Sequence, residues 1–423
     1  MEDDIQLQFQ NLEKSATLAI NEQSSALEQD GQDIIKFGFG QSPFPVPETV
    51  VDTLKVYAHR KEYISVEGLP ELRSTIAGTY SKELGTECDG SQVFIGPGTK
   101  ELMFLLQMIH DGETIISTPS WVSYSPQASM LKRKVSYIHT SSDSDWLLSA
   151  SQLDDELKKF SSVPKLLILN YPGNPSGTSY KEKDLIALAE TARKHKILIL
   201  SDEIYGRLNH EGNHRSIAEF YPEGTIISSG LSKWCGAGGW RLGHFLFPKK
   251  MKQLMQSMAA AASETFSCVS APIQFAAVRA YQADDSIKNY QFHTRRVLKL
   301  IGQYSTKKLN EGGIKTVAPT GGFYLFPDFS DIKDSFSTRG ISDSPTLCKK
   351  LLEDTGVALL PGSAFFRNRL ELTARLAYVT FDGAKALQKS AKQPSDGFSF
   401  DHLNPTCNRV VEGIDRIIDW IHQ

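Results

Sequence analysis

The chain has 423 residues, of which 40% are hydrophobic and 10% aromatic, and its formal net charge at pH 7 is -3. This length is enough for two domains, and the composition is typical of a globular protein with a substantial core. The slightly acidic balance lacks the basic excess of nucleic-acid-binding proteins, so we expect no nucleic-acid partner. It does not argue against small acidic substrates, which need only a local cationic pocket.

The start of the chain and its cysteines indicate a cytoplasmic protein. The first residues, MEDDIQLQFQ, are acidic and polar, so we expect no secretory signal. No run of about 18 apolar residues is present, so we expect no membrane span. The five cysteines are odd in number and have neither CxxC nor metal-ligand spacing, which favours reduced thiols and no metal site. They are Cys88, Cys235, Cys268, Cys348 and Cys407.

The N-terminal part predicts a polar arm that leads into a turn-rich stretch. Residues 1–30 are polar and predict a helical arm. The prolines of GFGQSPFPVPE, residues 38–48, rule out a helix until after Pro47. From Glu48 to about Arg60 the pattern again predicts a helix.

The next long region alternates between short apolar runs and helical patterns such as residues 98–109 and 185–195. The apolar runs are continuous, as strands buried on both faces require. They cover residues 93–95, 114–117, 134–139, 165–169, 196–201, 225–229 and 244–247. Strand–helix–strand repetition predicts an α/β fold with a mostly parallel, doubly wound sheet.

From about Lys249 the pattern becomes longer and more helical. Residues 249–264 and 285–310 predict helices, and short strands are expected at residues 322–326 and 374–381. These elements predict a smaller α+β domain. The polar stretch 390–407, with Pro394, Gly397 and Pro405, predicts a surface loop before a closing helix at 408–421. We therefore expect an arm and part of the small domain at residues 1–48, a large domain at 49–290 and the small domain at 291–423.

Ligands of open parallel sheets bind beyond the carboxyl ends of the strands, so the residues after each apolar run are candidates. In GPGTKEL, residues 96–102, Gly98, Thr99 and Lys100 open a helix whose backbone amides suit a phosphate, although a plain turn fits equally well. In LNYPGNPSGT, residues 169–178, Asn174 lies in a turn forced by prolines.

Two later motifs carry stronger chemistry. Asp202, in SDEIYG, ends a buried apolar strand, which is costly unless a cation such as a protonated pyridine nitrogen meets it; a helix cap is the alternative. Tyr205 follows three residues later and could reach the same ligand. Lys233 lies in the glycine-rich SSGLSKWCGAGGWRLG, where its amine can form an imine with an aldehyde, and Arg241 suits a phosphate.

The motifs NPSGT, SDEIY, GLSK and GWRLG, in this order, resemble the class I/II pyridoxal-phosphate aminotransferases of fold type I, in the aspartate aminotransferase superfamily. The resemblance runs from about Phe37 to Thr380. It implies a large domain, residues 49–290, that binds pyridoxal 5'-phosphate. It also implies amino-group transfer between an L-amino acid and a 2-oxo acid, with aspartate, glutamate and 2-oxoglutarate as default substrates.

The resemblance assigns roles around the cofactor ring. Lys233 is expected to hold the cofactor as a Schiff base and to move the proton between substrate Cα and cofactor C4′. Asp202 is expected to pair with the ring nitrogen, and Tyr205 and Asn174 to donate hydrogen bonds to O3′. Trp121, in TPSWVSY, matches the aromatic residue that stacks on the ring, although a core tryptophan is the plain alternative.

Further matches concern the phosphate and the neighbouring subunit. Gly98, Thr99, Lys100 and Arg241 match the phosphate cup. Tyr63, in EYISVEGLPELR, matches a tyrosine that reaches the phosphate of the neighbouring subunit, so the resemblance implies a homodimer.

The substrate is expected to meet Arg375 through its α-carboxylate. A lone arginine in an apolar strand is costly unless it binds an anion, and its fork suits a carboxylate. Gly40 matches a backbone contact to the substrate, and Asn174 and Trp121 also border it. Where many members carry a phosphate-binding serine this chain has Gly230, so the hydroxyl that completes the cup stays open.

Other functions remain as alternatives. The same scaffold supports carbon–sulfur lyases and synthases, which need no keto acid as amino acceptor. Some transcription regulators carry this domain behind a DNA-binding module, but about 35 residues precede Phe37, too few for a winged helix. An unrelated hydrolase or dehydrogenase lacks support because neither GxSxG nor a placed GxGxxG is present.

Overall fold

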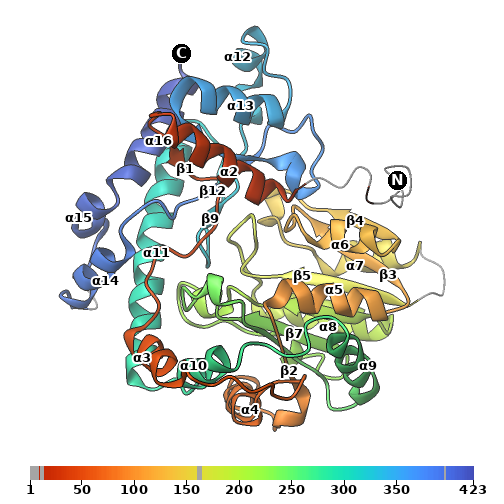
Figure 1. The fold of residues 1–423 in the computed structure, drawn as a ribbon. Helices are drawn as coiled ribbons and strands as arrows, with labels where there is room; N and C mark the ends of the chain where they lie inside the picture. Colours follow the sequence, from red (N-terminus) through yellow and green to blue (C-terminus); the bar gives the residue numbers. More distant parts are fainter. Residues whose placement is uncertain (1–8, 10–13, 160–163, 395–396) are drawn as a thin grey trace, which may run out of the picture.

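The computed structural model describes residue 9 and residues 14–159, 164–394 and 397–423. Within the predicted arm, residues 1–8 and 10–13 lie outside this set, and α2, Ala16–Gln29, confirms a helix in the remainder. Ile20 and Leu27 of α2 pack against Leu352 and Ala358, near the C-terminal part of the molecule. In Figure 1 α2 is the red helix that lies beside α13 (Ser344–Thr355) and α16 (Asn408–Ile421).

The central element is a seven-stranded sheet in the order β2-β8-β7-β6-β5-β3-β4. The pairs from β7 through β6, β5 and β3 to β4 are parallel, and β8 runs antiparallel to both of its neighbours. The mostly parallel α/β sheet is therefore confirmed. The strands are β2 (Val93–Gly96), β3 (Glu113–Thr118), β4 (Val135–His139), β5 (Lys165–Asn170), β6 (Leu198–Asp202), β7 (Thr225–Gly230) and β8 (Gly243–Leu246).

Alternate residues of each inner strand face opposite layers of helices, which explains the continuous apolar runs. Leu166 and Ile168 of β5 join one cluster with α5, α6 and α9, whereas Leu167 and Leu169 join another with α7 and α8. The sheet is thus doubly wound. The helices are α5 (Thr99–Ile109), α6 (Tyr124–Met130), α7 (Ala150–Leu157), α8 (Glu182–Lys194) and α9 (Lys252–Ser263).

At the edge of the sheet, α4 (Pro70–Leu84) packs against β2, and α10 (Ala271–Tyr281) packs against both α4 and α3 (Glu48–Tyr57). From there α11, Asp285–Glu311, runs as one long helix toward the part of the molecule around α16 (Figure 1). The Asp284 carboxylate caps its first turn by accepting a hydrogen bond from the Ile287 amide at 3.1 Å.

The C-terminal third adds short strands and helices, as expected of an α+β part. β9 (Tyr324–Leu325), β11 (Leu360–Pro361) and β12 (Ala374–Ala377) form an antiparallel sheet in the order β11-β12-β9. β1 (Ile35–Lys36) pairs in parallel with β10 (Val357–Ala358), so the segment after the arm is tied to this part. The remaining helices are α12 (Lys333–Thr338), α14 (Gly383–Ala391) and α15 (Phe400–Leu403).

The prediction of a surface loop at residues 390–407 is wrong in part. α14 continues to Ala391 and α15 forms at Phe400–Leu403, while residues 395–396 lie outside the described set. Phe398, only 8% exposed, and the buried Leu403 pack into the core, and the Phe400 ring stacks on Tyr304 of α11 at 3.9 Å. The polar composition hid these three apolar side chains, which fix the segment to α11.

Candidate active site

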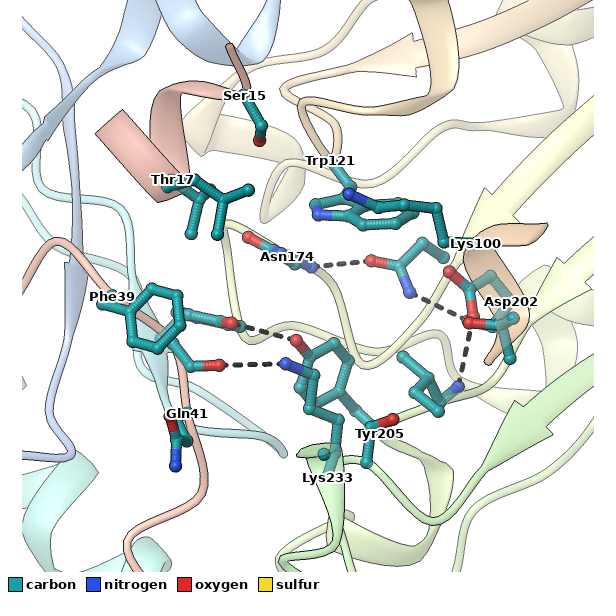
Figure 2. A pocket seen from close by; sticks show the side chains of 18 of the residues that line it. Ser15, Thr17, Phe39, Gln41, Lys100, Trp121, Asn174, Asp202, Tyr205 and Lys233 are labelled. Carbon is teal, nitrogen blue, oxygen red and sulfur yellow. Dashed lines mark hydrogen bonds between the residues drawn. The ribbon is translucent and has the colours of Figure 1, made fainter. Parts of the chain in front are cut away.

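A cavity of about 500 Å³ lies at the carboxyl ends of β5, β6 and β7 (Figure 2), within the size range of small-molecule sites. Four cationic side chains line it, from Lys100, Lys233, Arg241 and Arg375. Among the described residues only one carboxylate, that of Asp202, faces them. This excess of positive charge predicts a ligand that carries several negative charges.

Most residues predicted from the sequence meet in this cavity. Gly98 is not part of the lining. It lies next to it, because a Cβ at this position would overlap the guanidinium of Arg241, which lines the cavity. Tyr63 lies outside the cavity and is 89% exposed in the single chain. The predicted residues that line the cavity are Gly40, Thr99, Lys100, Trp121, Asn174, Asp202, Tyr205, Lys233, Arg241 and Arg375.

Lys233 follows β7 in the glycine-rich turn and is half-buried. Its Nζ donates a hydrogen bond to the Gly40 carbonyl at 2.9 Å and lies 5.8 Å from the centre of the Tyr205 ring. Gly40 cannot carry a side chain here, because a Cβ would overlap the Tyr324 hydroxyl. Among the described residues the amine, which lines the cavity, hydrogen-bonds only to this backbone carbonyl, and this position suits an amine that forms an imine with an aldehyde (Figure 2).

Asp202 is the last residue of β6 and only 3% exposed. Its carboxylate accepts a hydrogen bond from the Tyr124 hydroxyl at 2.5 Å. Burial raises the pKa of Asp202 to about 7, and the Tyr124 hydrogen bond opposes this rise. A cationic ring nitrogen at this carboxyl group would restore its ionised form, so the site fits a protonated pyridine.

Asn170 holds the carboxyl ends of β5 and β6 in place. Its Nδ2 donates to the Asp202 carbonyl at 2.8 Å, and its Oδ1 accepts from the Asn174 amide at 2.7 Å. These bonds place the Asn174 side chain over the cavity, where its Oδ1 accepts from Arg375 Nη1 at 3.1 Å. One side chain thus positions two of the predicted ligand contacts.

Arg375 is only 1% exposed, and no carboxylate among the described residues pairs with it. Besides Asn174 it donates to the Gly38 carbonyl at 2.6 Å, and its Nε has no hydrogen-bond partner among the described residues. Its guanidinium lies 4.8 Å from the Tyr324 ring, whose hydroxyl is 2.9 Å from that of Tyr205. Burial lowers the pKa of Arg375, so a bound carboxylate would relieve the cost of this cation.

The N-terminus of α5 and Arg241 form a second anion site within the same cavity. Gly98, with φ of 88°, caps the helix, and the Arg241 Nη1 donates to the Gly238 carbonyl at 3.0 Å. Free backbone amides at Thr99 and Lys100 together with this guanidinium suit a phosphate. The arrangement therefore fits the phosphate of the expected cofactor.

Lys100 and Trp121 lie together above this site. The Lys100 Nζ is 5.1 Å from the centre of the Trp121 ring, and Figure 2 shows the lysine side chain extended along that ring. Burial, followed by Arg241 and Lys233, lowers the pKa of Lys100. Trp121 lines the cavity, and an indole ring is suited to stacking on a planar ligand.

Ser232 is the hydroxyl-bearing side chain near Gly230 that lines this cavity. Ser229 faces a different cavity, beside Glu203 and Arg207. At Gly230 a Cβ would lie 2.7 Å from the Leu242 carbonyl oxygen, too close for a serine without backbone movement. The structure therefore favours Ser232 as the hydroxyl that completes the phosphate site.

Sequence reasoning missed several lining residues. Asn170 ends an apolar run and could have been found by the rule that found Asp202. Tyr124, three residues after Trp121, and Tyr324 carry no local signal, because their partners lie on distant elements. Ser15, Thr17 and Leu18 of the arm, and Phe39 and Gln41 after it, also line the cavity (Figure 2).

Comparison with known proteins decides the family. Residues 32–380 match the family described as aminotransferase class I and II. The chain belongs to this family. It is 32% identical over 379 residues to an aspartate aminotransferase of Bacillus subtilis, covering 87% of this chain and 93% of that protein. Over 380 residues it is 30% identical to an asparagine–oxo-acid transaminase of Streptococcus mutans, with the same coverage.

Solved structures agree with this class I/II assignment. The aspartate aminotransferase of Thermotoga maritima has a TM-score of 0.82 at 26% identity, with 99% of this chain and 100% of that chain covered. That of Thermus thermophilus has a TM-score of 0.81 at 27% identity, covering 92% of this chain and 98% of that one. The predictions of fold type I, an aminotransferase activity and pyridoxal 5'-phosphate as cofactor are confirmed.

Proposed function

We propose that this aminotransferase acts on dicarboxylic substrates, moving the amino group between an amino acid of the aspartate or glutamate type and a 2-oxo acid. The single observation that supports this is the charge of the cavity, with four cations facing the carboxylate of Asp202. Phosphate would take Arg241 and the helix N-terminus, and the α-carboxylate would take Arg375. Lys100 would then remain for a second carboxylate.

When bound, pyridoxal 5'-phosphate supplies an aldehyde and an electron-withdrawing ring that stabilises negative charge at the substrate Cα. Lys233 would bind the aldehyde carbon, and its amine would act as the general base that moves the substrate Cα proton. Asp202 would keep the ring nitrogen protonated, because its ionised form needs a cation next to it. Tyr205, supported by the Tyr324 hydroxyl, and Asn174 would hold the ring oxygen.

Substrate orientation would come from the two faces of the cavity. Arg375 would bind the α-carboxylate through its fork, and Trp121 would cover the ring from the opposite side to Lys233. Holding the substrate in one orientation in this way would supply a large part of the rate enhancement. Gly40, with its carbonyl already next to the Lys233 amine, would contact the substrate through its backbone.

Lys100 takes a different role in this proposal from the one that the family resemblance implied. Its backbone amide, at the start of α5, would bind phosphate. Its side chain extends along Trp121 on the side of the cavity where Ser15 and Thr17 of the arm lie (Figure 2). An ammonium group and two hydroxyl groups suit the second carboxylate of an acidic substrate.

Spectral titration of the holoenzyme with aspartate, glutamate, alanine and phenylalanine tests this proposal, because conversion of the bound cofactor changes its absorption band. We expect aspartate or glutamate to act at the lowest concentrations. Lys100→Ala should reduce the preference for acids over alanine about 10- to 100-fold. Lys250→Ala, a change on the surface, is the control. Equal response to alanine and aspartate, unchanged in Lys100→Ala, would refute dicarboxylate specificity.

The same preparation separates aminotransferase from lyase chemistry, since only the former requires a keto acid to restore the starting spectrum. Substrate consumption without a keto acid would favour the carbon–sulfur lyase or synthase alternative.

We further propose a homodimer in which Tyr63 reaches the phosphate of the neighbouring subunit. Two observations support this: the Tyr63 side chain is 89% exposed in the single chain, and it is not part of the lining of its own cavity. The division into residues 1–48, 49–290 and 291–423 is part of the same proposal. Among the described residues no helix is both long and apolar enough to cross a bilayer. A cytoplasmic location remains our prediction.

A further inference from the structure

A second cavity, of about 230 Å³, lies between α4, α11 and the segment that follows β6. Its lining shares no described residue with that of the active site. Most of the side chains that face it are polar or charged. Those that matter here are Glu83, Glu203, Arg207, His214, Gln291 and Arg295.

Arg295 of α11 is the unusual member of this set. Its guanidinium rests against Gly212, where a Cβ would lie 3.1 Å from Cζ. Within the described residues it has no hydrogen bond or ion pair. Burial and then the neighbouring Arg207 lower the pKa of Arg295, so this cation is held next to another cation.

The glutamates that face the cavity are already paired with other groups. Glu83 lies 3.0 Å from Arg207, and Glu219 accepts from Arg215 at 2.8 Å. The buried Glu203 accepts from Ser201 at 2.8 Å and from Ser216 at 2.5 Å, and its other oxygen lies 2.9 Å from His214 Nε2. Among the described residues, none of these carboxylates forms an ion pair with Arg295.

A further group lacks a partner at the same place. Gln291, one helical turn before Arg295 on α11, is only 7% exposed, and its Nε2 donor has no hydrogen-bond partner among the described residues. Buried polar groups without partners are costly, so a set that includes an unpaired guanidinium indicates a missing acceptor with negative charge.

We propose that this cavity binds a small oxyanion, a phosphate or a short carboxylate, between Arg295 and Arg207. The volume is large enough for such a group and too small for a second cofactor. Bidentate contacts from a guanidinium fit both chemistries. Because Glu203 directly follows Asp202 in the chain, the site lies behind the proposed catalytic carboxylate and is separate from it.

Calorimetric titration of the holoenzyme with inorganic phosphate tests the proposal, with the cofactor saturating and the ionic strength held constant with chloride. We expect one saturable site per chain. Arg295→Gln should raise the dissociation constant for phosphate at least about tenfold. Arg295→Lys, which keeps the charge, should raise it less. Arg193→Gln removes an arginine from an exposed ion pair with Glu223 and should leave binding unchanged.

A second arm with acetate and succinate distinguishes the source, since the anion whose binding weakens in Arg295→Gln is the one that the second cavity takes. Any binding at the active site is common to wild type and variants, so the difference reports on this cavity. Gln291→Leu, which keeps both arginines, should also weaken binding and guards against a folding defect in Arg295→Gln. Absence of a saturable site, or titrations of Arg295→Gln and Gln291→Leu that superimpose on wild type, would overturn the proposal.

Discussion

Asp202 ties the electrostatics of the cavity to the stability of the protein. Its carboxyl group is buried at the end of β6, and burial raises its pKa from 3.8 to about 7. In the unfolded chain the group loses its proton near its ordinary pKa, whereas in the folded, cofactor-free protein it keeps the proton to about pH 7. Between these values the folded state binds more protons than the unfolded state.

The first prediction follows from that difference. The contribution of Asp202 to the unfolding free energy of the cofactor-free protein should fall by about 3 kcal/mol as the pH rises from about 4 to about 7, because ionising Asp202 in the fold is costly. Asp202→Asn should remove this pH dependence. Denaturant unfolding of both proteins at several pH values measures it. Parallel pH profiles for the two proteins would contradict the prediction.

At the residue scale, the sequence identified those site residues that stand in local motifs. Lys233, Asp202 and Asn174 each follow an apolar strand within a short motif, and the rule about strand ends applies to each of them. Tyr124 and Tyr324 could not be predicted. They meet Asp202 and Tyr205 across separations of 78 and 119 residues, and such pairings depend on tertiary packing.

At the scale of elements, the strands were predictable because burial on both faces leaves a continuous apolar run. The closing helix, α16, also matches its predicted bounds at Asn408 and Ile421. The segment before α16 does not match the predicted surface loop, since Phe398 and Phe400 are isolated apolar residues in a polar stretch and gave no signal of a packed segment. Their packing on α11, with the Arg296 guanidinium 4.4 Å from the Phe398 ring, could not be read from composition.

The burial of Phe398 leads to a second prediction. Phe398→Ala should lower the free energy of unfolding by about 3 kcal/mol, because it removes a buried aromatic side chain and leaves a cavity. It should leave KM for the amino acid unchanged, since Phe398 is not part of the active-site lining. Denaturant unfolding and steady-state kinetics measure the two effects, with the exposed Phe292→Ala as the control. A stability equal to wild type would mean that the segment packs loosely.

At the scale of the whole molecule, the role proposed for Tyr63 requires two chains. Tyr63 is exposed in the single chain, yet the family resemblance gives it a role at the phosphate. We therefore predict that Tyr63→Ala weakens cofactor binding, although this side chain contacts nothing in its own cavity. Equilibrium dialysis against the cofactor measures the change.

Mixed dimers test the sharing of sites directly. Co-expressed Tyr63→Ala and Lys233→Ala chains should form hybrids in which one of the two sites has both residues intact. Activity should therefore exceed that of either variant alone. No recovery in hybrids confirmed by mass would show that the sites are not shared.

The covalent attachment of the cofactor to Lys233 is the claim on which the other roles depend. The most direct measurement is borohydride reduction of the holoenzyme, followed by proteolysis and mass spectrometry of the peptides. The account predicts the added mass of the cofactor on the peptide that contains Lys233, with Lys100 unmodified and no labelling in Lys233→Ala. A label on Lys100 or another lysine, or no label at all, would contradict it.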